Sequence, residues 1–119
     1  MKELMTLVFP FGRDKMTTVR LATGGLCALA GLGLDDSEDC KVCVTESLLL
    51  LMHRGYASAR VSFYEEEGLF VRIAGEGEGE EAPTEEDEIS FALLTALNDT
   101  LQTERRGERL QQISFRFGL

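Results

Sequence analysis

Residues 35–56 read DDSEDCKVCVTESLLLLMHRGY and carry the strongest periodic signal in the sequence. Apolar and small side chains recur there at i, i+3, i+4, i+7, i+8 and i+11, a spacing that places them on one face of a helix. This stripe consists of Cys40, Cys43, Val44, Ser47, Leu48 and Leu51. Acids at the start of the segment and Gly55 near its end are typical of helix termini. The segment therefore predicts a helix that buries one stripe against a core.

A β-hairpin is predicted immediately after this helix. Residues 57–64 and 69–74 alternate between polar and apolar side chains around a Glu66-Glu67-Gly68 turn. Such alternation is typical of strands with one face on a core, and the glycine-containing turn is typical of a hairpin. Three further strands are predicted over residues 4–9, 101–105 and 110–117.

Two more helices are predicted, one before residue 35 and one after the hairpin. The first runs from Asp14, the expected cap, to the helix breakers Gly31 and Gly33. Its Gly24-Gly25 pair lowers helix propensity, which predicts close packing against another element. The later helix has about three turns. Its expected buried face consists of Ile89, Leu93, Leu94, Leu97 and Leu101.

The order of these elements predicts the fold class. Three helices and five mostly hairpin-connected strands bury their apolar faces when the helices lie on one side of a largely antiparallel sheet. We therefore expect an α+β fold, a two-layer α/β sandwich with three helices on one face of a five-stranded sheet. A single domain over residues 1–119 is the expectation for a chain of this length.

The charge balance excludes several classes of partner. The 119 residues include 12 basic and 21 acidic side chains, a formal net charge of -9. This charge disfavours binding to nucleic acid or to an anionic membrane surface, so a protein or a small molecule is the expected partner. Three cysteines in apolar helical segments indicate a reduced, cytoplasmic protein. The longest uncharged run, residues 21–34, is too short to span a bilayer.

Eight of the acids fall within residues 76–88, a segment that contains no Lys or Arg. It has no apolar periodicity, so we expect a solvated loop that is dispensable for folding. Its Gly75-Glu76-Gly77-Glu78-Gly79 run stands between a strand and a helix, as phosphate-binding loops do, but carboxylates repel phosphate. The segment also lacks the glycine of a calcium loop, and the Cys40/Cys43 pair lacks further zinc ligands. No metal site is predicted.

The residues with catalytic chemistry are few. His53 is the only histidine, and no Gly-x-Ser-x-Gly motif surrounds a serine, which disfavours a Ser/His/Asp system. Glu46 is an acid in an otherwise apolar stretch. On a helix, Glu46, Leu50 and His53 share one face, beside the buried stripe. This face either lines a cleft or forms the solvated side of the helix.

The order of elements, residues 35–56 and the following hairpin that ends in VRIAGEGEGEE resemble the anti-sigma-factor serine kinases of the histidine-kinase-like ATPase superfamily. The resemblance covers nearly the whole chain. It implies that Glu46 occupies the general-base position of the family's Glu-x-x-x-Asn box, with the metal-binding Asn replaced by Leu50 and a further Asn by His53. It also places the adenine-binding Asp of an Asp-x-Gly-x-Gly motif on Gly75 and one of its glycines on Gly77.

The same resemblance implies that the nucleotide contacts are missing. Leu50 cannot ligate magnesium, and Gly75 cannot accept the adenine amino proton. Residues 80–91, which correspond to the ATP lid and phosphate box, are acidic and lack glycine. We expect a degenerate domain without catalytic residues, metal or cofactor, which binds a regulatory protein such as a sigma factor or an anti-sigma antagonist. Family members commonly dimerise through the sheet side, so the strand over residues 4–9 is the expected edge for a homodimer.

Two other functions remain open on the sequence. One is an atypical serine protein kinase that binds Mg-ATP and uses Glu46 as its base. The other is a small-effector-binding domain, in which Leu50, Met52 and Gly75 have made the former nucleotide cleft apolar.

Overall fold

The computed structural model describes residues 1–77 and 85–118, and this part of the chain contains the predicted helices and strands. The strands are β1 (Lys2–Pro10), β2 (Ser58–Glu65), β3 (Leu69–Glu76), β4 (Gln102–Arg106) and β5 (Arg109–Phe117). The helices are a short 3-10 turn, η1 (Arg13–Lys15), and α1 (Met16–Leu29), α2 (Leu34–His53) and α3 (Glu85–Leu97). None of the helices in the described ranges is long and apolar enough to cross a bilayer.

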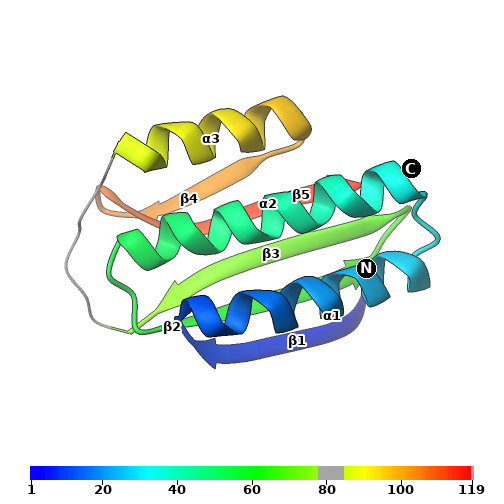
Figure 1. Ribbon diagram of the computed structural model, residues 1–119, viewed down its shortest axis with the longest axis horizontal. Helices are drawn as coiled ribbons and strands as arrows, with labels where there is room; N and C mark the ends of the chain where they lie inside the picture. The colour runs from blue at the N-terminus through cyan, green and yellow to red at the C-terminus, as the bar shows by residue number, and fades with distance from the viewer. Residues whose placement is uncertain (78–84, 119) are drawn as a thin grey trace.

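The strands form one antiparallel sheet with the order β1-β2-β3-β5-β4. β1 and β4 are therefore its edges. Figure 1 shows the three helices on one face of this sheet, with α2 between α1 and α3. The α+β class and the two-layer arrangement are thus confirmed.

The core lies between the helices and the sheet. All six residues of the predicted α2 stripe are buried. The apolar residues of the hairpin are buried in alternation, with Val61 and Phe63 of β2 paired with Ile73 and Val71 of β3. The residues that follow the helical period in α2 and those that alternate in the hairpin therefore contribute to the same core.

The start of α1 differs from its prediction. Asp14 does not cap the helix, because it lies within η1 and the N-cap position is Lys15; its carboxylate accepts a hydrogen bond from Lys15 Nζ at 2.9 Å. This bond lowers the pKa of Asp14. A Cβ added to Gly24 would lie 2.9 Å from Lys41 Cε on α2, whereas one added to Gly25 would have no neighbour within 4 Å among the described residues. The predicted close packing is confirmed for Gly24 and wrong for Gly25.

The buried face of α3 also differs from its prediction. Ile89 is 64% exposed and Leu93 is 39% exposed, whereas Asp87 and Ser90 are buried together with Leu94. The helix ends at Leu97, so the predicted continuation of this face to residue 101 is wrong as well. Polar side chains are stable in a buried face when each has a hydrogen-bond partner, and α2 supplies those partners.

The three cysteines are free and buried between α1 and α2, as the sequence predicts. The neighbouring Cys40 thiol lowers the pKa of Cys27 to about 7. Contact with Cys27, together with burial, raises the pKa of Cys40. Burial raises the pKa of Cys43 to about 12. The cysteines thus serve as packing residues that join two helices.

Candidate functional site

Glu46 and His53 face α3, and so they neither line a cleft nor lie on a solvated side of α2. Ser90 Oγ donates a hydrogen bond to Glu46 Oε2 at 2.6 Å. His53 Nδ1 lies 2.8 Å from Asp87 Oδ1, and Arg54 donates to Asp87 Oδ2 at 2.7 Å. We call these five residues the α2–α3 polar seam. The seam covers the face of α2 that carries Glu46 and His53.

The ion pair between Arg54 and Asp87 is the most buried part of this seam. Their side chains are 8% and 6% exposed. Two charges removed from water are costly unless each meets a well-placed opposite charge, and here one carboxylate contacts both a guanidinium and an imidazole. Asp87 also lies in the first turn of α3, where the helix dipole favours a negative charge. The seam therefore determines where α3 packs.

Asp87 and Glu76 correct the expectation that the acids of residues 76–88 are solvated and have no basic neighbours. Asp87 binds Arg54, the residue that follows α2, and Glu76 Oε1 accepts a hydrogen bond from Arg60 Nε of β2 at 2.7 Å. This second bond raises the pKa of Arg60. Both arginines are distant in sequence, so the charge pattern along the segment does not reveal them. Residues 78–84, the centre of the predicted loop, lie outside the described part of the chain.

Leu50 is separated from its two predicted neighbours on α2. Its side chain is fully buried in the apolar core, while Glu46 and His53 are only partly buried and meet α3. α2 is covered by the sheet on one side, by α1 on a second and by α3 on a third. Leu50 therefore has no access to solvent.

Gly75 and Gly77 line a different cavity, at the end of β3. This cavity of about 430 Å³ is also lined by Tyr56, Glu76, Arg106, Arg109 and Gln111. Its lining is polar and includes neither Leu50 nor Met52, which corrects the expectation of an apolar cleft. The residues expected at one nucleotide site are thus divided among the seam (Glu46 and His53), the apolar core (Leu50) and this cavity (Gly75 and Gly77).

Tyr56 fills the space that a side chain at position 75 would need. A Cβ added to Gly75 would overlap the Tyr56 ring. The ring is held in place because Tyr56 Oη donates to the Leu110 carbonyl at 2.7 Å, and the Arg109 guanidinium lies 4.0 Å from the ring centroid. Arg109 in turn donates to the Arg54 carbonyl at 2.8 Å, which connects the cavity to the seam.

The polar partners in α3 were missed by the sequence analysis, although a signal for them exists. Asp87, Ser90 and Leu94 follow one another at i, i+3 and i+7, which is itself the spacing of a helix face. When only apolar residues are considered, a different face of α3 is predicted, because Ile89 and Leu93 also follow the helical period. Arg54, Tyr56 and Arg109 have no comparable local signal.

The seam has the chemistry of a helix-packing contact. His53 and Asp87 resemble a base with its orienting acid, but within the described residues no hydroxyl or thiol is hydrogen-bonded to His53, and Ser90 binds Glu46 instead. In the same part of the chain, no group of three or more His, Cys, Asp and Glu side chains is placed to hold a metal ion.

The Ser90→Ala substitution is expected to lower the free energy of unfolding by about 1–2 kcal/mol, because it leaves the partly buried Glu46 carboxylate without this donor. Thr95→Ala is the matched control, since the exposed Thr95 hydroxyl donates only to a carbonyl of its own helix. Urea denaturation of both variants measures the difference. Equal stabilities would show that the Ser90–Glu46 bond contributes nothing.

No protein-family model matches this chain, and no curated protein matches its sequence.

Proposed function

We propose that this chain is a non-catalytic protein-interaction module, a degenerate relative of the anti-sigma-factor kinase domains that binds a regulatory protein without ATP. The observation that carries the proposal is the α2–α3 polar seam. The face of α2 that carries Glu46 and His53, the general-base position and the second Asn position of such a kinase, is covered here by α3 through polar contacts with Ser90 and Asp87.

Two further features support the loss of nucleotide chemistry. Leu50, at the position of the metal-binding Asn, is buried among apolar side chains. Gly75, at the position of the adenine-binding Asp, lies against the Tyr56 ring. The arrangement of three helices on one face of an antiparallel sheet is compatible with the histidine-kinase-like ATPase fold, but fold alone does not imply activity. As an edge strand, β1 offers unpaired backbone groups for the homodimer that the resemblance implies.

Mg-ATP and Mg-ADP are expected to leave the melting temperature of the protein unchanged. A ligand present at 100 times its dissociation constant would stabilise the folded state by about 2.7 kcal/mol, which a thermal melt detects readily. Titration calorimetry at low-millimolar nucleotide is the second measurement. A saturable shift would instead support the atypical kinase, in which α3 has to leave Glu46 before that carboxylate can act as a base.

Protein binding is tested by native affinity purification from the cells that produce the chain, with and without enzymatic removal of ATP. We expect a complex of constant stoichiometry in both preparations. A complex that requires ATP, or a chain that purifies alone under all conditions, would contradict the proposed function.

A small-effector-binding domain is the second candidate, and the polar cavity at Gly75 and Gly77 favours it. Arg106 and Arg109 supply two guanidinium groups there, and the Glu76 carboxylate is engaged by Arg60. Such a cavity suits an organic anion rather than the apolar ligand expected from the sequence. A melting shift with a small carboxylate or phosphate compound, lost in Arg106→Gln but retained in Arg105→Gln, would support this candidate.

A further inference from the structure

α1 has no acidic side chain and one basic side chain, Arg20. Residues 15–34 contain no Asp or Glu, although the whole chain has 21. Lys15, just before α1, is paired with Asp14. Arg20 forms no ion pair or hydrogen bond within the described part of the chain. In a protein with a net charge of -9, this helix therefore provides a local surface that attracts acidic groups.

The same helix exposes a line of apolar residues. Leu21 is 74% exposed and Leu29 is 70% exposed, and Gly25 lies midway between them. The three positions are four residues apart, so they follow one another along one side of α1. Gly25 is unfavourable within a helix, and no contact inside the described chain explains it. A glycine between two exposed leucines lets another backbone approach closely.

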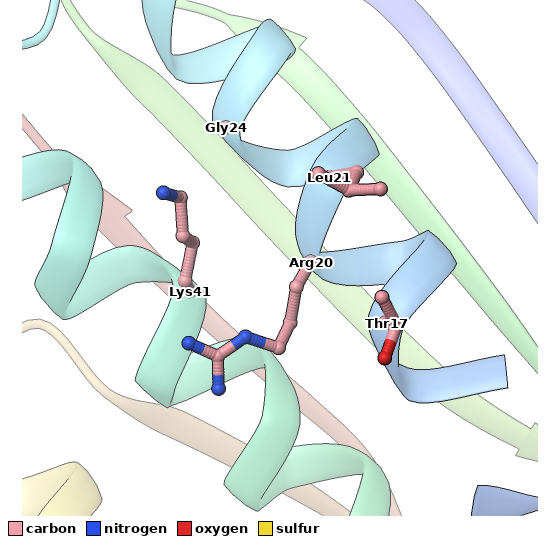
Figure 2. Close-up of a pocket in the computed structure, with 5 residues that line it drawn as sticks. All are labelled: Thr17, Arg20, Leu21, Gly24 and Lys41. Atoms are coloured by element: carbon pink, nitrogen blue, oxygen red, sulfur yellow. The ribbon is translucent and has the colours of Figure 1, made fainter. Parts of the chain in front are cut away.

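A groove runs beside this line, between α1 and α2. Its volume is about 380 Å³, and it is lined by Thr17, Arg20, Leu21, Gly24 and Lys41. Figure 2 shows Arg20 extending from α1 towards α2 and Lys41 extending from α2 towards Gly24. Glu38 partly neutralises Lys41 through an ion pair of 3.0 Å, whereas Arg20 is available to a ligand. The groove thus combines an apolar wall with a cationic rim.

We propose that Leu21, Gly25 and Leu29, with the adjoining α1–α2 groove, dock a helix of the partner protein that has an apolar stripe flanked by acidic residues. The apolar stripe of such a helix covers the two leucines, its backbone approaches α1 at Gly25, and its acids pair with Arg20. This inference rests on the proposed function and adds to it the surface and the chemistry of the partner. A second copy of this α1 offers Arg20 no acidic partner, because α1 contains no Asp or Glu.

Site-specific photocrosslinking in the producing cells tests this surface. A benzoylphenylalanine replaces Leu21 or Leu29 in two variants, and it replaces the 64% exposed Ile89 on α3 or the 55% exposed Val8 on β1 in two controls. We expect adducts at Leu21 and Leu29 with one protein, at least tenfold above those at Ile89 and Val8. Mass spectrometry of the adduct is expected to locate the crosslink in an acidic amphipathic helix.

Two substitutions then test the stated contacts. Gly25→Gln places a side chain in open space, so the melting temperature is expected to stay constant or rise while the adduct yield falls at least tenfold. Arg20→Glu is expected to lower the yield several-fold, and Arg105→Glu on exposed β4 is the matched control. An unchanged yield in Gly25→Gln would overturn the proposal.

The other outcomes separate this proposal from the proposed function. Protein adducts only at Val8 or Ile89 overturn the docking surface but leave a protein-interaction module. Lipid adducts at Leu21 identify a membrane-facing helix, and adducts of Leu21 or Leu29 with a second copy identify α1 as a self-association surface; either result overturns the proposal. No adduct at Leu21 and Leu29 also overturns the docking surface, and the affinity purification described above then tests the protein-interaction function by itself.

Discussion

The Leu50→Asn substitution, which restores the residue of the family's Glu-x-x-x-Asn box, is expected to lower the free energy of unfolding by about 3–5 kcal/mol. Leu50 is fully buried, so the substitution removes apolar contacts and places a polar amide in the apolar core. Small domains are stable by about 5–15 kcal/mol, so this loss is a large fraction of the total. Denaturant-induced unfolding, followed by circular dichroism, measures it.

Leu49→Asn is the matched control, since Leu49 is only partly buried on the same helix, and we expect a smaller loss there. Adding Gly75→Asp to Leu50→Asn is expected to destabilise the protein further, because the new side chain overlaps the Tyr56 ring. The double variant is therefore expected not to bind ATP. A stable double variant that binds Mg-ATP would show that the domain retains a nucleotide site, and would contradict the proposed function.

The Asp87→Ala substitution is expected to lower the free energy of unfolding by about 3–5 kcal/mol, because it removes the carboxylate from a buried ion pair with Arg54 and from its contact with His53. Hydrogen exchange in α3 is expected to accelerate most, since the seam holds this helix against α2. Denaturant-induced unfolding of the variant measures the loss of stability, and hydrogen exchange on the same variant tests whether the loss is located in α3.

Glu88→Ala is the control, because Glu88 is exposed one residue later in the same helix, and it is expected to change stability by less than about 0.5 kcal/mol. A Gly/Ser linker in place of residues 76–88 should destabilise the protein strongly, since it removes Asp87. The sequence predicts that residues 76–88 are dispensable, whereas the contacts of Glu76 and Asp87 predict the opposite for a replacement that includes these two residues. Equal stability of Asp87→Ala and Glu88→Ala would show that the seam has no role in folding.

Gly24 and Gly25 of α1 are both unfavourable in a helix, but the structure explains them differently. Both Gly24 and Gly25 weaken the helix, and the sequence offers close packing as one reason for both. The structure supports that reason only at Gly24, where Lys41 crosses from α2. The sequence does not predict this difference. The two residues are adjacent along the chain but lie on different sides of the helix.

The sequence by itself determined the helices, the strands, the hairpins and the antiparallel two-layer class, because hydrophobic periodicity reports directly which side of each element meets a core. It also determined that Glu46 lies on a different side of α2 from the buried stripe. It did not determine what covers that side. Only the tertiary structure decided that α3 binds there through Asp87 and Ser90, and that Tyr56 occupies the space beside Gly75. The contacts of α3 join residues 33 to 44 positions apart. Asp87 and Ser90 follow a helical spacing, but polar residues are recognised as a buried face only when their partners are known.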